Sequence, residues 1–404
     1  MTDPSARLLD GLTVLDFTRV LAGPYCTRLM ADLGARVLKI ERPGEGDDTR
    51  RGYIQLEDGR GDQASYFVRI NVGKESVGLD LSHPRGREVV LDLARKADVA
   101  IENFLPGVAA RLGIDHTALS RVKPDIICCS ISGFGQTGPM RDTPAFHHII
   151  NAVSGIMYLE RQDQPVPPVS YLQAADVLAG THAFGAIMAA LFRHGRTGRG
   201  AYLDVSMLEA MIAAEDITYG AMINGGAEYP GPRAGMIVHH LEGGDFAMQT
   251  VGAPQLWNRL LTAMKRPELN DDPRFSTPLA RRQNWPALVP IILEWLDGFG
   301  TRERALAGLR EARLPASPVL SPVEVMALPH LEARTAFPEV PHPARGKIRV
   351  TAVPFHVDGH PSPPAAGAPY RIGEHTRHVL GGLLGYSAAR IEELAKAGAI
   401  GVAG

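Results

Sequence analysis

An alternation of short apolar runs with longer helical patterns, in the first half of the chain, most constrains the fold. The runs contain many β-branched side chains, and the segments between them have helical spacing. This alternation is typical of βαβ units around a parallel sheet. The predicted strands are residues 12–17, 36–41, 76–81, 99–101 and 125–130, and the predicted helices are residues 23–34 and 84–96. We therefore predict an α/β, doubly wound, Rossmann-like domain.

The second half begins with a long helix and then changes character. Residues 176–194 are rich in Ala, Gly and Met, which allow close packing, and a strand is predicted at 201–206. From about residue 225 to 320 the pattern is that of a smaller domain, with a hairpin at 239–251 that turns at Gly243 and Gly244. Helices are predicted at 255–264, 285–296, 374–384 and 387–397.

Charge and cysteine content exclude several classes of protein. The chain has 404 residues and a formal net charge of -2, which gives no reason to expect a nucleic-acid partner. Three cysteines are too few for a disulfide framework or a zinc site, so no metal is expected. The N-terminus lacks a signal-peptide pattern, and no span reaches the ~20 apolar residues of a transmembrane helix. We predict a cytoplasmic protein with no membrane partner.

Common catalytic motifs are missing from the sequence. The first predicted βα turn contains a single glycine, Gly23, which disfavours NAD or FAD, and there is no phosphate loop. Neither H-E-x-x-H nor G-x-S-x-G occurs. The doublets His147-His148 and His239-His240 are interpreted as structural or hydrogen-bonding residues, because neighbours on an element point to different sides.

Asp176 is the carboxylate of greatest interest, because it stands between a loop and the small-residue helix. Residue statistics favour a simple helix N-cap. The position also suits a nucleophile, since helix amides and the helix dipole hold a carboxylate anionic and the small neighbours leave room for an acyl group. The local pattern leaves both interpretations open.

Ordered motifs along nearly the whole chain resemble the class III CoA-transferases. The match is weakest between about residues 225 and 320. The matching segments are residues 9–24 (LDGLTVLDFTRVLAGP), 34–43 (GARVLKIERP), 71–81 (NVGKESVGLDL), 98–104 (DVAIENF), 132–139 (SGFGQTGP), 175–176 (AD), 196–200 (RTGRG) and 373–376 (GEHT).

This resemblance implies a discontinuous large CoA-binding domain, residues 1–224 with 326–404, and a small α+β domain, residues 225–325. It also implies a homodimer of interlocked, ring-like subunits, with acyl-CoA and a carboxylic acid as substrates and no permanently bound cofactor. By resemblance Asp176 is the nucleophile, which forms a mixed anhydride with the acyl group and then an aspartyl-CoA thioester. The resemblance further implies CoA contacts at Leu21, Ala22, Arg42, Leu79, Asn103, Phe104, Leu105 and Arg111.

Two departures from the family pattern bear on the substrate. His147 stands where many relatives have an acidic residue, so it is predicted to contact the acyl carboxylate or the anhydride. The predicted small domain has only Gly243-Gly244 where formyl-CoA transferase has a longer glycine run, which makes formate or oxalate doubtful. Polar residues that include His147 and Tyr53 suggest a dicarboxylate of four to six carbons as one of the substrates. It would enter either as the acyl group of the donor, such as succinyl-CoA, or as the acceptor acid.

An acyl-CoA racemase or epimerase of the 2-methylacyl-CoA type is the main alternative on the same fold. Such enzymes resemble this family and pair the aspartate with a histidine, which corresponds to position 146 in this chain. This chain has Phe146 there, and His147 is expected to point elsewhere if the segment is helical. We therefore favour transfer over racemisation.

Overall fold

The computed structural model describes residues 7–161, 164–170, 172–226, 235–250 and 254–403. Its contacts divide the chain into two compact units. The large unit comprises residues 1–228 and 332–404, and the small unit comprises residues 229–331. The corresponding boundaries predicted from the sequence are 224/225 and 325/326.

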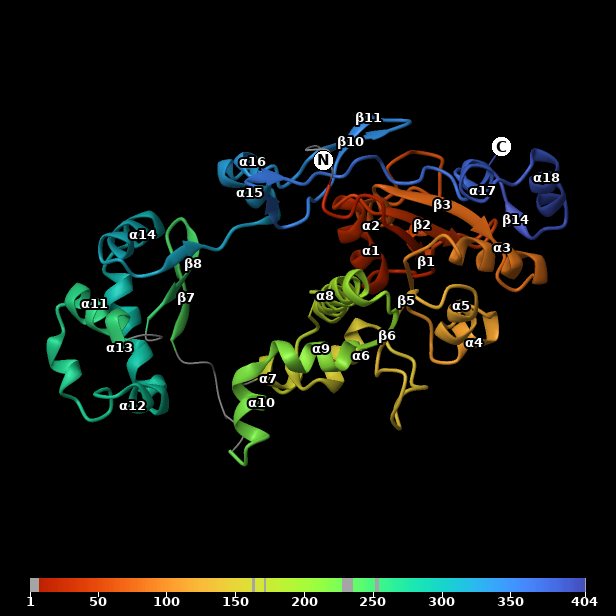
Figure 1. Cartoon of the computed structure of the whole chain (residues 1–404). Helices are drawn as coiled ribbons and strands as arrows, with labels where there is room; N and C mark the ends of the chain where they lie inside the picture. Colours follow the sequence, from red (N-terminus) through yellow and green to blue (C-terminus); the bar gives the residue numbers. More distant parts are fainter. Residues whose placement is uncertain (1–6, 162–163, 171, 227–234, 251–253, 404) are drawn as a thin grey trace. The chain divides into compact units, whose positions relative to one another are not determined.

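A seven-stranded, mostly parallel sheet forms the centre of the large unit (Figure 1). Its strands are β1 (Thr13–Asp16), β2 (Arg36–Glu41), β3 (Lys74–Leu79), β4 (Val99–Glu102), β5 (Ile127–Ser132), β6 (Ala201–Ser206) and β14 (Ile400–Gly401). They lie in the order β14-β3-β2-β1-β4-β5-β6, and only β14 runs antiparallel to its neighbour. Without β14 the order is 3-2-1-4-5-6, so the predicted α/β sheet is confirmed. In sheets of this order ligands bind where the order reverses, at the carboxyl ends of β1 and β4.

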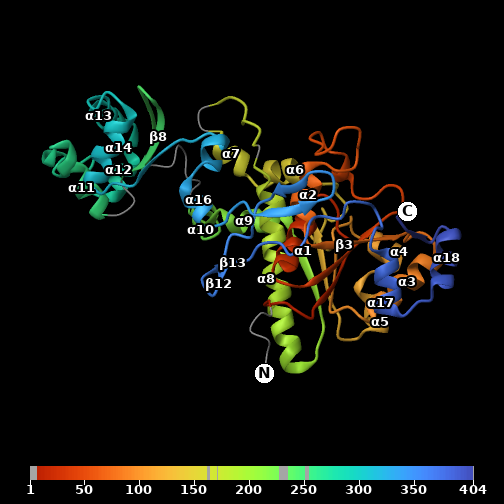
Figure 2. The same cartoon turned by 90° about the horizontal axis from the view of Figure 1, so that it is seen from above.

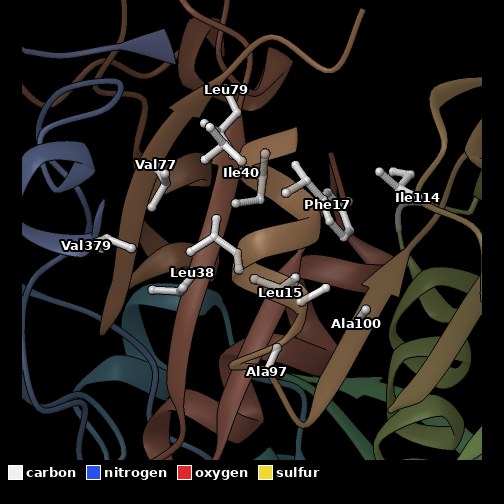
Figure 3. Close-up of a cluster of buried hydrophobic side chains, with 14 of the residues drawn as sticks. Leu15, Phe17, Leu38, Ile40, Val77, Leu79, Ala97, Ala100, Ile114 and Val379 are labelled. Atoms are coloured by element: carbon white, nitrogen blue, oxygen red, sulfur yellow. The ribbon is translucent and has the colours of Figure 1, made fainter. Parts of the chain in front are cut away.

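Helices cover both faces of this sheet, because alternate strand residues point to opposite faces. Leu15, Leu38 and Val77 contribute to one apolar cluster, which is completed by α3 (Pro84–Ala94) and the C-terminal helices (Figure 3). Val14, Val37 and other strand residues contribute to the cluster on the opposite face. There the covering helices are α1 (Ala22–Asp32), α8 (Ala174–Thr197) and α9 (Met207–Ala214).

The C-terminal segment completes the large unit. β14 pairs with β3, and α17 (Thr376–Leu384) and α18 (Ala388–Lys396) lie beside α3, although more than 280 residues separate them in sequence (Figures 1 and 2). A side-chain hydrogen bond fixes the junction, since Thr376 Oγ1 accepts from the Gly78 amide at 2.9 Å.

The long helix α8 corrects one sequence-based expectation. It is 24 residues long and has a mean hydropathy of 1.5 in its most apolar window, so by length and composition it could cross a membrane. The expectation that no segment is long and apolar enough is therefore wrong. Alanines and the larger apolar side chains Val, Leu, Ile, Phe and Met cause this apolar character. Its buried stripe, which includes Ala175, Ala179, Ala183 and Ile187, packs into the second apolar cluster.

The small unit has its own apolar cluster. The hairpin predicted at 239–251 is present as β7 (Met236–Leu241) and β8 (Gly244–Gln249), and β9 (Ala316–Pro318) pairs with β8. The cluster includes Phe246 from β8, together with Trp257 and Leu288 from helices. The helices that contribute to the cluster are α11 (Pro254–Met264), α13 (Trp285–Asp297) and α14 (Arg302–Glu311).

The remaining elements are short. They are the 3-10 helices η1 (Asp48–Arg51) and η2 (Pro267–Asn270), the helices α2 (Ser65–Asn71), α4 (Val108–Leu112), α5 (His116–Val122), α6 (His147–Val153), α7 (Ile156–Glu160), α10 (Asp216–Met222), α12 (Pro278–Gln283), α15 (Pro322–Met326) and α16 (Pro329–Ala333), and the hairpin strands β10 (Glu339–His342), β11 (Gly346–Arg349), β12 (His356–Val357) and β13 (His360–Pro361).

Candidate functional site

The turn from β1 to α1 lies at the reversal point of the sheet and has an unusual backbone. Val20 has a φ of 68°, in the left-handed region that β-branched residues rarely adopt. Gly23 is required by a close approach, because a Cβ there would lie 2.2 Å from Thr18 Cγ2. The turn is thus folded tightly against the start of α1.

Three side chains from other segments of the chain hold this turn. Asn103, which follows β4, accepts a hydrogen bond from the Arg19 amide at 2.8 Å and donates one to the Arg19 carbonyl at 2.8 Å. Asp47, which precedes η1, accepts from the Val20 amide at 3.4 Å. Lys39 Nζ of β2 donates to the Thr18 carbonyl at 3.0 Å. The backbone of residues 18–20 is therefore fixed from both sides of β1.

Asp176 faces the end of this turn. It is the third residue of α8, and its carboxylate accepts a hydrogen bond from the backbone amide of Ala22, the first residue of α1. Gly180, one helical turn further on, makes this possible, since a Cβ there would lie 2.5 Å from the Ala22 carbonyl oxygen. The N-cap of α8 is Gln173, so the interpretation of Asp176 as an N-cap is wrong.

Burial gives Asp176 an unusual acidity. Desolvation raises the pKa of this carboxyl to about 6, and the hydrogen bond from Ala22 lowers it only in part. Within the part of the chain that the structure describes, no cation lowers this pKa. The carboxylate is thus ionised at neutral pH but poorly solvated, a state that favours nucleophilic attack.

His147 lies against this carboxylate. Its Nδ1 is 3.5 Å from Asp176 Oδ2, and both side chains are about 15% exposed. The expectation that His147 points elsewhere is wrong, because α6 begins at His147 and the preceding Phe146 is extended. The ring of His148 lies 3.7 Å away, centroid to centroid. Burial and the neighbouring His148 lower the pKa of His147, which favours a neutral imidazole beside Asp176.

A cavity of about 530 Å³, here called the reaction cavity, opens onto Asp176 and His147. It lies beyond the carboxyl ends of β1, β4 and β5. Six of its other lining residues are polar or charged, and the rest are apolar residues or glycine from strands, helices and loops. The lining residues are Arg19, Val20, Ala22, Asp48, Asn103, Phe104, Leu105, Ile131, Ser132, Gly133, Pro144, Ala145, Phe146, His147, His148, Gln173, Asp176 and Met207.

A second cavity of about 220 Å³, here called the sheet-edge cavity, lies over the ends of β2 and β3. Arg42 and Leu79 line it, and Arg19 and Phe104 line both cavities. The Arg42 side chain is 60% exposed and pairs with Glu45 at 3.2 Å. Two cavities that share lining residues can accommodate a long ligand with chemically different ends.

Buried ion pairs lie next to the turn between β1 and α1. Lys39 pairs with Asp47 at 2.9 Å, and Lys74 pairs with Asp16 at 3.1 Å, all with side chains no more than 1% exposed. Burial alone would raise the pKa of Asp47, but Lys39 and hydrogen bonds from Thr49 together lower it to about 2. These carboxylates are neutralised by cations, in contrast to Asp176.

The structure distributes the predicted site residues unevenly. Ala22, Asn103, Phe104, Leu105, His147 and Asp176 line the reaction cavity, and Arg42, Leu79 and Phe104 line the sheet-edge cavity. Leu21 is 1% exposed at the N-cap of α1, and its side chain lines neither cavity. Arg111 on α4 and Tyr53 after η1 are exposed and line neither.

Sequence reasoning missed two contributors to the site. Gly180 was part of the predicted small-residue helix, but its role depends on which helix crosses α8. Asp48, which pairs with Arg19 at 3.1 Å at the cavity wall, carried no sequence signal at all. Among the described residues no group of three or more His, Cys, Asp or Glu side chains could hold a metal ion.

Comparisons with known proteins agree with this geometry. A family profile described as CoA-transferase family III matches residues 9–376. Succinyl-CoA:glutarate CoA-transferase from Mus musculus is 32% identical over 404 residues, covering 98% of this chain and 91% of that protein. Acetyl-CoA:oxalate CoA-transferase from Acetobacter aceti is 36% identical over 364 residues, covering 88% and 90%. The crystal structure of a CaiB/BaiF family protein from Brucella suis superimposes with a TM-score of 0.76 at 30% identity, covering 94% of this chain and 100% of that one.

Proposed function

The chain belongs to CoA-transferase family III, and from that premise we propose that it moves CoA between a dicarboxylic acyl-CoA, such as succinyl-CoA, and a carboxylic acid through covalent intermediates on Asp176. One observation carries the proposal. Asp176 is a buried carboxylate without a cation, and it lies in the reaction cavity with a backbone amide directed at it.

The first half-reaction takes the acyl group off CoA. A carboxylate oxygen of Asp176 attacks the thioester carbonyl, the C–S bond breaks, and CoA leaves as the thiolate. The product is a mixed anhydride between Asp176 and the acyl group. The thiolate then attacks the Asp176 carbonyl carbon, which releases the first acid and leaves an aspartyl-CoA thioester.

The second half-reaction repeats these steps in reverse with the acceptor acid. The acceptor carboxylate attacks the aspartyl thioester, and CoA leaves again as the thiolate. The thiolate then attacks the acyl carbon of the new anhydride, which forms the product thioester and restores the Asp176 carboxylate. Each step exchanges one acyl bond for another, so the energy of the thioester is retained as long as water is excluded.

The Ala22 amide has a defined role in this scheme. When the thiolate attacks the Asp176 carbonyl carbon, negative charge develops on an oxygen of that side chain. A backbone N–H at the N-terminus of α1 is already directed there, and a fixed donor needs no reorganisation as the charge forms. We assign Ala22 N–H to stabilise this oxyanion.

The CoA moiety is proposed to extend from the reaction cavity into the sheet-edge cavity. Phe104 lines both cavities and Arg42 stands at the outer one, where a guanidinium group suits a phosphate. The remaining CoA contacts are assigned by resemblance. They are Leu21, Ala22, Leu79, Asn103, Leu105 and Arg111, of which Leu21 would act through its backbone and Arg111 from outside both cavities.

A dicarboxylic acyl group suits the reaction cavity. Arg19 lines the cavity, where it pairs with the exposed Asp48 at 3.1 Å and donates to the Gly46 carbonyl at 3.4 Å, and its 42% exposed side chain can also bind a remote carboxylate of the substrate. His147, beside Asp176, is proposed to contact the acyl group or the anhydride oxygen. Tyr53 is proposed as a further substrate contact, which would have to reach the cavity from the surface because its side chain is exposed.

The test is direct trapping and exchange. Succinyl-CoA is incubated with the protein and then with hydroxylamine, and peptide mass spectrometry is expected to show a hydroxamate at Asp176. A screen of C2 to C6 mono- and dicarboxylic acids, read by mass of the new thioester, is expected to favour C4 to C6 dicarboxylates. Transfer that persists in Asp176→Ala would show that another group is the nucleophile.

A racemase would need different geometry around Asp176. Two groups that exchange a proton on opposite faces of an α-carbon must lie about 6 Å apart, twice the reach of a hydrogen bond. Asp176 and His147 lie 3.5 Å apart, which leaves no room for that carbon. In deuterated water without an acceptor acid, 2-methylacyl-CoA is therefore expected to keep its α-proton. Loss of that proton would favour racemisation.

An interlocked, ring-like homodimer is proposed as the working assembly. Several large apolar side chains of the large unit are exposed in the single chain, which supports coverage by a second copy. They are Phe146 (67%), Ile149 (46%), Val153 (46%), Tyr158 (52%) and Phe192 (68%). Light scattering is expected to give twice the 43.5 kDa chain mass, and a monomer in solution would contradict the proposal.

A further inference from the structure

The amide that faces Asp176 is held in place by an unfavourable backbone conformation two residues earlier. Val20 has a φ of 68°, and a β-branched side chain disfavours this left-handed region. If Val20 relaxed to a negative φ, the chain direction into α1 would change. The Ala22 amide would then no longer point at Asp176. The surroundings must therefore keep Val20 in this conformation.

Asn103 provides the strongest local restraint. Its carboxamide makes two hydrogen bonds of 2.8 Å with the peptide groups on either side of Arg19, one as acceptor and one as donor. A residue that is hydrogen-bonded at both its amide and its carbonyl cannot rotate freely, so φ and ψ of Arg19 and the orientation of the peptide group that leads into Val20 are constrained. The contact from Asp47 to the Val20 amide is longer, at 3.4 Å.

We propose that Asn103 is a positioning residue for the covalent chemistry of Asp176, because its carboxamide holds the Arg19-Val20 backbone in the form that directs the Ala22 amide at the Asp176 carboxylate. This inference rests on the proposed function. It differs from a role in CoA affinity alone, since both polar atoms of the Asn103 side chain are already engaged with the protein backbone.

The two roles predict different kinetics. A residue that only binds CoA changes KM for the thioester, whereas a residue that aims an oxyanion donor changes kcat. Removing one oxyanion donor in other enzymes typically lowers kcat by about a hundredfold to a thousandfold. Misdirecting the donor without removing it is expected to cost less, about 30-fold to 100-fold in kcat, with KM changed less than about threefold.

The experiment is a double-mutant cycle with Asn103→Ala and Val20→Gly. Glycine adopts a positive φ readily, so in the Val20→Gly background the turn no longer needs the restraint. The loss of kcat caused by Asn103→Ala is therefore expected to shrink at least fivefold in that background. Equal losses in both backgrounds, or a change in KM alone, would overturn the inference.

Controls separate structural damage and failure of the proposed function from failure of this inference. Asn284 in the small unit also bonds backbone through its side-chain amide, so Asn284→Ala is the matched control and is expected to keep kcat. If Asn103→Ala does not fold, Asn103→Asp, which accepts from Arg19 but donates nothing, enters the same cycle with the same criteria. Absence of a trapped adduct at Asp176 in the unaltered protein would refute the proposed function itself, whereas an adduct with additive losses would refute only the role of Asn103.

Discussion

Asp47 and Asp176 are two buried carboxylates of the large unit with opposite properties. Asp47 is almost fully buried, yet Lys39 and Thr49 outweigh the effect of burial and lower its pKa to about 2. Asp176 is less buried, but desolvation raises its pKa to about 6, and no cation among the described residues offsets this effect. The difference shows that the partner of a buried carboxylate decides its chemistry more than the depth of burial does.

This contrast also separates the functions of neighbouring regions. The ion pairs behind the turn stabilise the fold around β1 and β2, and their charges are cancelled within the protein. The reaction cavity keeps an uncancelled negative charge on Asp176, because Arg19, the arginine that lines this cavity, pairs with Asp48 instead. The reactive carboxylate of Asp176 thus lies in a fold that is stabilised by the ion-paired carboxylates of Asp16 and Asp47.

The largest expected effect on stability is that of Asp47→Asn. Removing one partner of a buried ion pair leaves the other charge buried and uncompensated, which typically costs about 3 to 5 kcal/mol. We expect a loss of this size in the free energy of unfolding at pH 7, measured with urea. Because the pKa of Asp47 is lowered, its contribution is present above pH ~4 and disappears as the pH falls towards 2.

The neighbouring Asp48 is the control for this measurement. Its side chain is 59% exposed and it pairs with Arg19 on the surface, so Asp48→Asn is expected to change the free energy of unfolding by less than about 1 kcal/mol. Similar losses in the free energy of unfolding for both variants would show that the buried ion pair of Asp47 stabilises the fold no more than the exposed pair of Asp48.

Asp176→Asn is expected to change the free energy of unfolding in the opposite direction, that is, to raise it. The folded protein raises the pKa of Asp176, so its ionised form destabilises the fold at any pH above about 6. The amide cannot ionise, and the variant should gain about 1 to 3 kcal/mol at pH 8 while it loses transfer activity. The gain should shrink between pH 6 and pH 4 and vanish below. A variant less stable than the parent at pH 8 would contradict the raised pKa.

Much of the sheet could be predicted from the sequence, because buried parallel strands are continuous apolar runs. The strands at 36–41 and 201–206 were predicted with the bounds of β2 and β6. Short elements such as α2 and α4 to α7 escaped prediction, since five to seven residues carry too little periodicity. The correct strand bounds did not depend on any knowledge of the helices that cover them.

The site was less predictable, because its geometry depends on contacts between distant segments. His147 was expected to point away, and only the start of α6 at that residue turns it towards Asp176. The approach of α8 to α1 at Gly180 depends on the crossing of two helices, which no local pattern encodes. Asp176 itself stood out from its position, but the local pattern could not decide between a helix cap and a nucleophile.

The smallest expected effect is that of removing an exposed charge at the sheet-edge cavity, in contrast to the buried charges of Asp47 and Asp176. Arg42 is 60% exposed, so its charge is largely screened by solvent and its contact with a CoA phosphate is expected to be worth about 1 kcal/mol. Arg42→Ala should therefore raise KM for the acyl-CoA about threefold to tenfold and leave kcat within twofold. Arg51→Ala, an exposed arginine of η1 that lines neither cavity, is the matched control and should change neither constant. A large fall in kcat for Arg42→Ala would mean that the outer charge takes part in the chemistry, and the division between a binding cavity and a reacting cavity would then fail.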